Sequence, residues 1–407
     1  MKKSYYRIKF NNASSLNVGG NENIVTDKDL IRDGSGKPYI PGTSLAGVYR
    51  GAFLEDEADR LFGSISMDND SSIITYDATI IGDYSTSYRD MVSIDREYGV
   101  ARKGMKFDFE VLEPGAQFIT YLEVNDSDAG DVIASRFLSN DFTFGSKTSR
   151  GLGAIENVEI KKIVFNLPED KDKWNSFDVY NDARWIDAAV FEETVETDKN
   201  VYCFDLLLKQ ISPLLIRTYS TEVSDDEKIS LPDSIQLSFR KGDKQIPIIP
   251  GTSWAGVFRH RMSQLNPDHS NLVFGMNDDE NGNKDEDVND GKHIKSRITF
   301  SESQLENCKY KTVTRNSIDR FKGGASNKSL FTEKYCYDGT TTLRVKIDKD
   351  VDAKTFNAFC ACVCDLNNGL LSVGGEASVG RGIFKVEKVN GWDVVADELF
   401  DHLKGEY

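Results

Sequence analysis

The stretch IPGTSLAGVYR occupies Ile40–Arg50, and the chain repeats it as IPGTSWAGVFR at Ile249–Arg259. Only two positions differ between the copies, leucine against tryptophan and tyrosine against phenylalanine. Both changes keep a bulky apolar side chain, so both copies suit the same packing position. A phrase of this length that recurs within one chain indicates a structural template that is used twice.

Three further phrases recur in the same order, and the spacing between the copies grows along the chain. They are LFG at Leu61–Gly63 with VFG at Val273–Gly275, the SIDR segments from Ser93 and Ser317, and FGSKTSRGLGAI from Phe144 with VGGEASVGRGIF from Val373. Growing spacing indicates loops of different length between the same elements. We therefore predict a tandem duplication, with one unit over residues 1–185 and another over 186–407. We expect the polar stretch Pro168–Asn200 to be a loop or linker at the join.

Each unit has the pattern of a strand, a helix, further strands, a second helix and a last strand. The first strands are expected at Tyr5–Phe10 and Cys203–Gln210, and the first helices after Thr43 or Thr252 as N-caps. The apolar stripes of these helices are Leu45, Val48, Tyr49, Ala52 and Phe53, and Trp254, Val257, Phe258 and Met262. This order predicts an α+β fold of two tandem ferredoxin-like (RRM-like) modules, each with two helices on one face of an antiparallel sheet. We expect the other face to be free, as in RNA-binding modules of this topology.

Composition limits the class of protein. A chain of 407 residues with 39% hydrophobic content fits two packed domains of about 200 residues. The sequence has no apolar run of the ~20 residues that span a membrane, and the stretch from Met1 has no apolar signal region. The six cysteines have no disulfide-framework or zinc-finger spacing, so we expect free, buried thiols in a reducing cytoplasm and no zinc site.

The formal net charge of −16 argues against indiscriminate binding to nucleic acid. Much of the acid lies in one stretch, Asn277–Asp290, which we expect to be a solvated loop. The repeated phrases are more basic than the rest of the chain. The charge therefore weakens an RNA-binding hypothesis without excluding it.

The phrase GSKTSRGLG, Gly145–Gly153, combines glycines with two cations, Lys147 and Arg150. Glycines allow backbone N–H groups to approach a ligand closely, and the cations suit phosphate. The alternative is a tight turn from helix to strand with ordinary surface charge. The other copy keeps Ser378 and Arg381 but has Glu376 where Lys147 would fall, which weakens a phosphate-binding role there.

The SIDR segments predict hairpins with cations beside a glycine-containing turn. These cations are Arg96, Arg102, Lys103 and Lys106 in the first copy and Arg320, Lys322 and Lys328 in the second. One interpretation is a structural Asp–Arg pair that fixes a loop. The other is a projecting hairpin that reaches a strand of nucleic acid.

Together, the PG phrase, the SIDR segment and the closing glycine-rich loop resemble the RAMP superfamily, whose members form the repeated backbone subunits of type III CRISPR–Cas effector complexes. The resemblance implies modules that stack along a guide RNA and insert a hairpin, the thumb, across the guide–target duplex. It also implies RNA contacts in the basic and glycine-rich motifs. The expected RNA-binding residues are Arg50, Arg96, Arg102, Lys103, Lys147, Ser149, Arg150, Gly151, Arg259, Arg320, Lys322, Ser378 and Arg381.

In family members that cut target RNA, a catalytic aspartate precedes the PG helix. The matching phrase here is DKDLIRD, which puts the catalytic and metal-binding carboxylate on Asp27. A kinked RNA can cut itself when its 2′-OH is aligned with the neighbouring phosphate, and a carboxylate with Mg²⁺ or another divalent cation assists. In the second copy, aligning Arg32 with Arg240 places Ile235 opposite Asp27. Asp233 is then a weaker candidate, and the second module is expected to bind RNA without a clear cutting residue.

The resemblance thus implies a double backbone subunit that occupies two adjacent positions on a guide CRISPR RNA. Its partners would be target RNA and other effector subunits, with no membrane and a cytoplasmic location. One alternative is a non-cleaving RNA-binding scaffold, and another is a protein-interaction module without RNA. A further alternative is a stand-alone RNA-processing enzyme, and such enzymes commonly use a histidine as general base. The four histidines, His260, His269, His293 and His402, all fall outside the matched catalytic loop.

Overall fold

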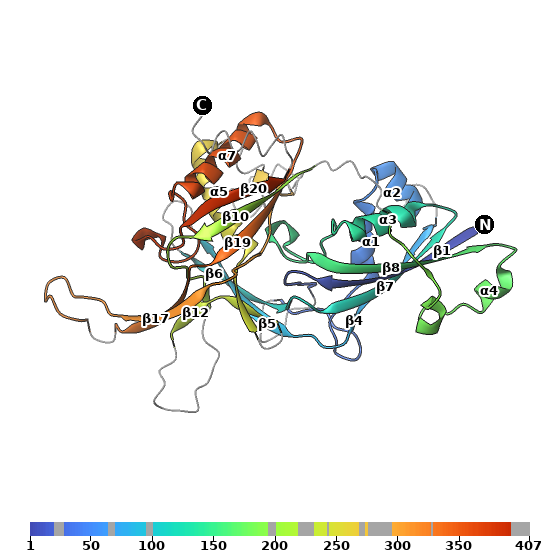
Figure 1. Ribbon diagram of the computed structural model, residues 1–407, viewed down its shortest axis with the longest axis horizontal. Helices are drawn as coiled ribbons and strands as arrows, with labels where there is room; N and C mark the ends of the chain where they lie inside the picture. Colours follow the sequence, from blue (N-terminus) through green and yellow to red (C-terminus); the bar gives the residue numbers. More distant parts are fainter. Residues whose placement is uncertain are drawn as a thin grey trace, which may run out of the picture. The chain divides into compact units, whose positions relative to one another are not determined.

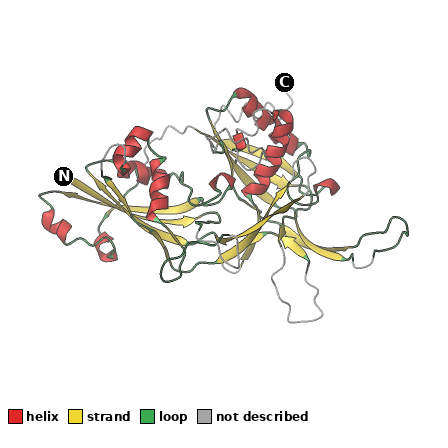
Figure 2. Cartoon of the chain, turned by 180° about the vertical axis from the view of Figure 1, so that it is seen from behind, coloured by secondary structure: helices red, strands yellow, loops and turns green. Residues whose placement is uncertain are grey.

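The computed structural model describes residues 1–19, 28–63, 70–94, 101–193, 201–218, 232–241, 244–267, 273–275, 295–326 and 329–391 (Figures 1 and 2). The chain forms two compact units. The first consists of Met1–Thr148 and Leu152–Asp198, and the second of Ser149–Gly151 and Lys199–Tyr407. The units divide after Asp198, later in the chain than the join expected after residue 185. The acidic stretch Asn277–Asp290 lies outside the described residues.

The first unit follows the expected order of elements. Its elements are β1 (Lys2–Asn12), β2 (Tyr39–Ile40), α1 (Gly42–Arg50), α2 (Glu55–Phe62), β3 (Ile73–Thr75), β4 (Ala78–Ile81), β5 (Thr86–Ile94), β6 (Ala101–Leu112), β7 (Gln117–Asn125), α3 (Ala129–Leu138), the 3-10 turn η1 (Thr148–Arg150), β8 (Ile155–Asn166), α4 (Lys171–Asn175), the 3-10 turn η2 (Asp182–Trp185) and β9 (Ala189–Val190). The sheet has the strand order β2-β4-β7-β1-β8-β9, with β3 also paired to β7. Its centre, β4-β7-β1-β8, is antiparallel and has the ferredoxin-like order.

The second unit repeats this arrangement. Its elements are β10 (Val201–Gln210), β11 (Arg217–Thr218), β12 (Ser234–Gln236), β13 (Ser238–Lys241), β14 (Lys244–Ile249), α5 (Gly251–Leu265), β15 (Ile298–Phe300), β16 (Ser303–Gln304), β17 (Lys309–Arg315), β18 (Phe331–Tyr337), β19 (Thr340–Asp348), α7 (Ala353–Asn367), the 3-10 turn η4 (Ala377–Val379) and β20 (Phe384–Gly391). The main sheet has the order β15-β19-β10-β20, which matches the centre of the first sheet. Both units are therefore ferredoxin-like modules, as the sequence predicts.

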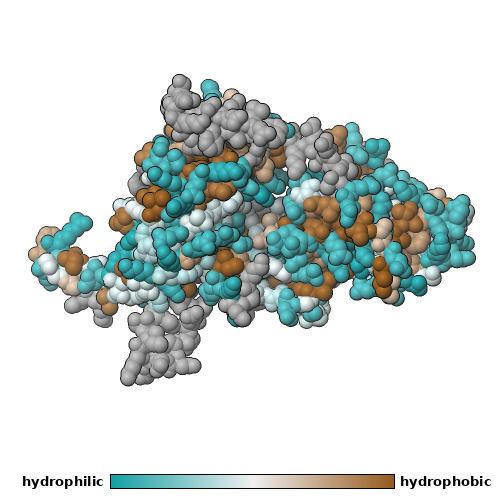
Figure 3. All heavy atoms as spheres, in the orientation of Figure 1, coloured by the Kyte–Doolittle hydropathy of each residue, from teal (hydrophilic) through white to brown (hydrophobic). Residues whose placement is uncertain are grey.

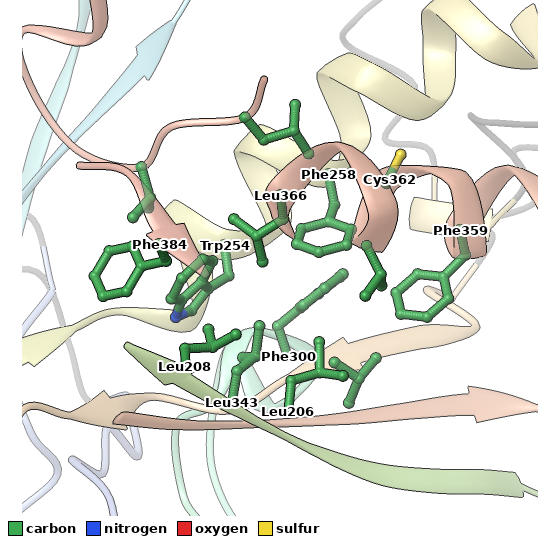
Figure 4. Packing of buried hydrophobic residues seen from close by; sticks show 14 of the residues in the cluster. Leu206, Leu208, Trp254, Phe258, Phe300, Leu343, Phe359, Cys362, Leu366 and Phe384 are labelled. Carbon is green, nitrogen blue, oxygen red and sulfur yellow. The ribbon is translucent and has the colours of Figure 1, made fainter. Parts of the chain in front are cut away.

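The helices of each unit pack on one face of its sheet, and their apolar stripes form the core. In the first unit Leu45 and Tyr49 of α1 are buried with Phe137 of α3 against β1. In the second, Trp254 and Phe258 of α5 pack with α7 and the strands, as Figure 4 shows. Helical spacing thus predicted the buried Leu45, Tyr49, Trp254, Phe258 and Met262 correctly, whereas Val48, Ala52, Phe53 and Val257 are only partly buried and α1 ends at Arg50, before Ala52 and Phe53.

The opposite face of the first sheet is covered, so the expectation of a free face is wrong for this unit. The cover is the segment after β8, residues 166–190, which was expected to be a loop or linker. Trp185 is fully buried in it, against Tyr5 and Tyr121 on the sheet. The Trp174 indole N–H also donates to the Tyr5 hydroxyl at 3.0 Å. Aromatic side chains in the polar stretch after β8 give this segment enough apolar area to pack.

The repeated PG phrase starts α1 and α5, but the threonines do not cap these helices. Pro41 and Pro250 occupy the N-cap positions, and no side chain of the cap residue forms a hydrogen bond. In the first unit the Asp77 carboxylate, from the turn after β3, accepts from the Gly42 N–H at 2.6 Å instead. A carboxylate from a distant part of the chain thus satisfies the helix N-terminus.

Close packing explains the glycine that follows each proline. A Cβ at Gly42 would lie 2.6 Å from the Thr75 carbonyl oxygen, at the end of β3. A Cβ at Gly251 would lie 2.3 Å from the oxygen of Phe300, at the end of the equivalent strand β15. Backbone atoms cannot move aside cheaply, so both positions require glycine.

All six cysteines are free, and three of them lie in α7. Cys336 is buried, whereas Cys203, Cys308 and Cys364 are only partly buried. A hydrogen bond between Cys336 and Cys308 lowers the pKa of the Cys308 thiol and raises that of Cys336. Within the described residues, no helix has the length and apolar character that crossing a membrane requires.

The glycine constraint predicts opposite effects for two substitutions in α1. Gly42→Ala should lower the free energy of unfolding by about 1–3 kcal/mol, because the added methyl meets the Thr75 carbonyl. Gly47→Ala is the matched control, since a Cβ there meets no atom within 4 Å. It should be neutral or stabilise the helix by up to about 1 kcal/mol. Thermal and urea unfolding of the full chain measure both, and equal effects would contradict the packing argument.

Candidate nucleic-acid interface

Each unit carries a long antiparallel hairpin apart from its main sheet, β5–β6 in the first and β17–β18 in the second. The registers of the two hairpins match. Met91 pairs with Phe107 in the first, and Arg315 pairs with Phe331 in the second. β5 ends within the first SIDR segment, at Ile94, with Asp95 and Arg96 outside the described residues, and the second SIDR segment lies in the loop between β17 and β18. The duplication therefore includes the hairpins and their pairing.

In the first unit, a segment of four residues that follows β1, Ser15–Val18, connects the β5–β6 hairpin to the glycine-rich loop. We call it the junction segment. Its Ser15 carbonyl accepts from the Gly153 N–H at 2.9 Å, on the side of the loop. On its other side, Leu16 and Leu112 exchange backbone hydrogen bonds of 2.9 and 2.8 Å, at the base of the hairpin. The loop and the hairpin are thus bound to the same short stretch of backbone.

The second unit has an equivalent junction segment, Pro213–Ile216. The Pro213 carbonyl accepts from the Gly382 N–H at 2.8 Å, and Leu214 pairs with Cys336 at the base of the second hairpin. In both units the last glycine of the loop has a positive φ, and its Cβ would lie 1.8 Å from the carbonyl oxygen of Phe144 or Val373. These glycines are therefore required by a tight loop closure.

Backbone pairing also aligns the segments that precede the PG helices. Lys28 forms a parallel bridge with Phe109, and Ser234 pairs in parallel with Glu333. Phe109 and Glu333 occupy the same register position in their hairpins. Lys28 therefore corresponds to Ser234.

A second contact gives the same alignment. The Ile31 N–H donates to the junction residue Val18 at 2.9 Å, and the Leu237 N–H donates to Ile216 at 2.8 Å. The alignment of Asp27 with Ile235 is therefore wrong. Because Lys28 corresponds to Ser234, Asp27 corresponds to Asp233 in the second unit.

Asp233 is exposed and lies beside Thr332, near the end of the second hairpin where β17 and β18 meet the connecting loop. Its Oδ2 accepts from the Thr332 N–H at 2.7 Å, and its own N–H donates to the Thr332 carbonyl at 2.8 Å. The carboxylate is thus fixed to β18. Asp27 itself lies outside the described residues.

The donor set at this position suits a metal ion only in part. No group of three His, Cys, Asp or Glu side chains that could hold a metal occurs among the described residues. Mg²⁺ is commonly held by one or two carboxylates together with substrate phosphates and water. A single fixed carboxylate such as Asp233 fits that arrangement when RNA supplies the remaining oxygens.

The glycine-rich loops keep one backbone shape but carry opposite charges. Lys147 and Glu376 both have a left-handed backbone, with φ of 56° and 62°. The Lys147 ammonium lies 4.2 Å from the centre of the Phe109 ring, which holds the cation on an aromatic face. In the second unit, the equivalents of this cation and this ring are the carboxylates of Glu376 and Glu333.

These two carboxylates form a compact cluster with arginines. Arg315 forms ion pairs with both Glu333 and Glu376, at 2.7 Å for the latter. The Arg217 guanidinium lies 3.1 Å from Glu333, and the Tyr335 hydroxyl lies 2.6 Å from the same side chain. The Glu333 side chain is only 4% exposed, so these partners must stabilise its negative charge in place of water.

Arg381, an expected RNA-binding residue, belongs to the same cluster. Its Nε is 3.7 Å from Glu376, and its guanidinium lies 4.9 Å from the centre of the Tyr335 ring. The second glycine-rich loop therefore uses its arginine inside the protein. This arrangement explains the glutamate that the sequence places in this copy.

Arg50 and Arg259 also make contacts inside the protein. Arg50 pairs with Asp59 and donates to the Gly63 carbonyl at 3.2 Å, and Arg259 donates to the Gly275 carbonyl at 3.4 Å. Gly63 and Gly275 end the repeated LFG and VFG phrases. These arginines thus connect each first helix to that phrase, and their contact with RNA stays a prediction.

The tip of the second hairpin is an ordered turn that presents Arg320, Phe321 and Lys322. The Asp319 carboxylate accepts from the backbone N–H groups of Phe321 and Lys322, at 2.8 and 3.0 Å. Phe321 is fully exposed. Figure 3 shows apolar and polar surface side by side on this loop, at the far left. The sequence analysis overlooked Phe321, although an aromatic between two cations in a turn is a signal for base stacking.

The other expected site residues are spread over both units. Ser149 and Ser378 lie in η1 and η4, Arg150 is exposed, and Gly151 takes a φ of 88°. Lys103 is exposed on β6. Arg96, Lys328 and the side chain of Arg102 are outside the described part of the chain, as are His269, His293 and His402. His260 is described and lies in α5.

The comparisons with known proteins identify the class. The family model for the RAMP superfamily matches residues 11–156 and 207–385, most of the chain. The chain belongs to the RAMP superfamily, and each matched region corresponds to one ferredoxin-like module.

One similar solved chain comes from a cryo-EM structure of the type III-B Cmr-beta complex bound to cognate target RNA. The identity is 16% and the TM-score is 0.32, over 39% of this chain and 61% of that one. The chain thus spans less than two thirds of that relative, and the likeness is too weak to support an inference. No curated protein matches the sequence.

The carboxylate–arginine cluster predicts a large stability effect. Glu333→Ala should lower the free energy of unfolding by about 1–3 kcal/mol, because Arg315, Arg217 and the Tyr335 hydroxyl all lose one hydrogen-bond or ion-pair partner while Glu376 remains beside Arg315. Glu387→Ala is the matched control, since that carboxylate is 51% exposed and 4.0 Å from Lys209. It should change stability by at most about 0.5 kcal/mol. Urea unfolding measures both variants, and a small effect of Glu333→Ala would show that the cluster does not stabilise the unit.

Proposed function

We propose that this chain is a double backbone subunit of a type III CRISPR–Cas effector complex that binds guide RNA and cleaves the paired target RNA. The observation that carries the proposal is the duplicated RAMP module, in which hairpin, junction segment and PG helix recur with matching backbone contacts. One chain would then occupy two adjacent positions along the guide. Other effector subunits would flank it.

In this proposal the hairpins insert across the guide–target duplex. The tip of the second hairpin supports this role, because an exposed aromatic between two cations suits an unstacked base and its phosphates. Thr332, near the loop end of the same hairpin, fixes Asp233. An inserted tip would therefore bring displaced RNA to the position of the carboxylate.

The proposed reaction is cleavage of target RNA by its own 2′-OH. The hydroxyl attacks the adjacent phosphorus, and the 5′-oxygen of the next nucleotide leaves. Asp27 in the first unit and Asp233 in the second would accept the 2′-OH proton or hold a divalent cation with the phosphate oxygens. When bound, that cation supplies neutralisation of phosphate charge. Asp233 lies at the position equivalent to Asp27, so both units have a residue for this role.

The cleavage proposal predicts separate losses for the two aspartates. In the complex purified with its guide RNA, Asp27→Ala should reduce one cut in a matching target by about 100-fold or more. Asp233→Ala should do the same at the neighbouring cut, and the double variant should lose both. Gel analysis of end-labelled target measures each product.

Asp29→Asn is the control, because it neutralises a neighbouring carboxylate in the same stretch of sequence. Loss of both cuts with Asp29→Asn would point to a structural effect. If wild-type complex retains guide and target but cuts nothing, the alternative of a non-cleaving scaffold is correct. If only Asp27 matters, the second module binds without cutting.

The hairpin tip makes a separate prediction about binding. Phe321→Ala should weaken target binding to the guide-loaded complex by about 1–3 kcal/mol, the usual range for loss of one base–aromatic stack. Leu54→Ala removes another exposed apolar side chain, 80% exposed before α2, and should leave affinity unchanged. Filter binding with labelled target measures both, and equal affinity for the Phe321 variant would argue against insertion.

A further inference from the structure

The base of the second hairpin holds two cysteines that contact each other. Tyr310 of β17 pairs with Cys336 of β18, and the bridge between Glu306 and Thr340 continues the same register. Cys308 therefore lies diagonally across from Cys336, on the same face of the hairpin. The two thiols share a hydrogen bond, so their sulfur atoms are neighbours in the folded chain.

The two thiols differ in accessibility and in acidity. Cys336 is buried, and its sulfur lies 3.8 Å from the Gln210 Oε1. Cys308 is only partly buried, and its hydrogen bond with Cys336 lowers the pKa of its thiol to about 7, against the effect of burial. A hydrogen bond with the Tyr310 hydroxyl adds to this lowering of the Cys308 pKa. Cys308 is thus a thiolate that a small reagent can reach, with a protonated thiol beside it.

The cysteines of α7 do not share these properties. Burial raises the pKa of the Cys364 thiol and raises that of Cys362 to about 12, so both are protonated at neutral pH. The Cys308–Cys336 pair also lacks the third and fourth ligands that zinc takes, since no group of three metal-ligating side chains occurs among the described residues. The chemistry open to the pair is therefore that of a dithiol.

The first unit builds the same hairpin base without thiols. Leu112 occupies the position of Cys336, because each pairs with a leucine of its own junction segment. By the registers of the two hairpins, Tyr84 occupies the position of Cys308. Backbone pairing at the hairpin base thus does not require cysteine, and the two thiols are a feature of the second unit alone.

We propose that Cys308 and Cys336 form a reversible redox pair, which a peroxide converts to a disulfide that staples the base of the second hairpin. The Cys308 thiolate attacks one peroxide oxygen, the O–O bond breaks, and the leaving hydroxide takes up a proton to become water. The Cys336 sulfur then attacks the sulfur of the Cys308 sulfenic acid. The S–S bond forms, the S–O bond breaks, and the oxygen leaves as water with the Cys336 proton. The two sulfurs are oxidised, the peroxide is reduced, and a thiol reductant reverses the reaction.

The disulfide would fix the start of β17 to the body of its unit. Cys336 and Leu214 of the junction segment exchange backbone hydrogen bonds of 3.0 and 3.1 Å, and the Gln210 side chain donates to the Cys336 carbonyl at 2.7 Å. Figure 1 shows the hairpin, labelled at β17, extending away from α5 and α7. Oxidation would therefore close a loop that contains the whole hairpin, which restricts the unfolded chain. The inference goes beyond the proposed function and does not depend on it.

The test is a hydrogen peroxide titration of the full chain, which is reduced beforehand and kept folded. After each dose the remaining thiols are alkylated, and mass spectrometry maps the peptides. We expect a crosslink between the peptides of Cys308 and Cys336 that dithiothreitol reverses, and a higher melting temperature for the crosslinked chain. Cys308→Ser should abolish the crosslink. Cys364→Ser is the matched control, another partly buried thiol, and should leave the crosslink unchanged.

A second variant separates the two steps of the reaction. In Cys336→Ser, dimedone should trap a sulfenic acid on Cys308, because the thiol that resolves it is missing. A wild-type chain whose two thiols stay reduced, or in which Cys308 is oxidised without a crosslink, would overturn the inference. A crosslink that forms only in urea would do the same, as would a crosslinked chain that melts at the temperature of the reduced one.

Discussion

The backbone hydrogen bonds of the junction segment are the constraint on which each unit depends. In the first unit, Ser15–Val18 accepts from the glycine-rich loop on one side and pairs with the base of the hairpin on the other. Its Val18 carbonyl also accepts from the Ile31 N–H, in the segment that precedes β2. The glycine-rich loop, the hairpin and the segment that begins at Lys28 are therefore hydrogen-bonded to the same four residues. Pro213–Ile216 provides the same anchor in the second unit.

The two units diverge where side chains, and not the backbone, determine the contact. Lys147 over Phe109 becomes Glu376 beside Glu333, yet both loop residues keep a left-handed backbone. Residues 166–190 cover one sheet face of the first unit, whereas Lys385 and Lys388, on the equivalent face of the second, are exposed. The backbone pairing and the close glycine contacts are the same in both units. The side chains that point outward differ, and neighbouring ones differ together. The duplication thus preserves the geometry of the module while its two surfaces take different roles.

Much of the fold could be predicted because it depends on local patterns. The stripe of Leu45 and Tyr49, the order of strands and helices, and the hairpins all follow from spacing and repetition. The capping of α1 could not be predicted, because the carboxylate that accepts from the Gly42 N–H belongs to Asp77, in a separate turn. The alignment of Asp27 with Ile235 was wrong since loop lengths differ between the copies, and only hydrogen-bond register reveals Asp233 as the counterpart. The cover over the first sheet was overlooked because a polar composition concealed the packing of Trp185.

The measurement that tests the central claim most directly is the identity of RNA that copurifies with the chain. The chain would be isolated from its native cells with its partners, and the bound RNA extracted and sequenced. The account predicts short RNAs of uniform length that share a repeat-derived end. Absence of RNA, or random fragments of mixed length, would contradict the role as a guide-bound backbone subunit, even though membership of the RAMP superfamily would stand.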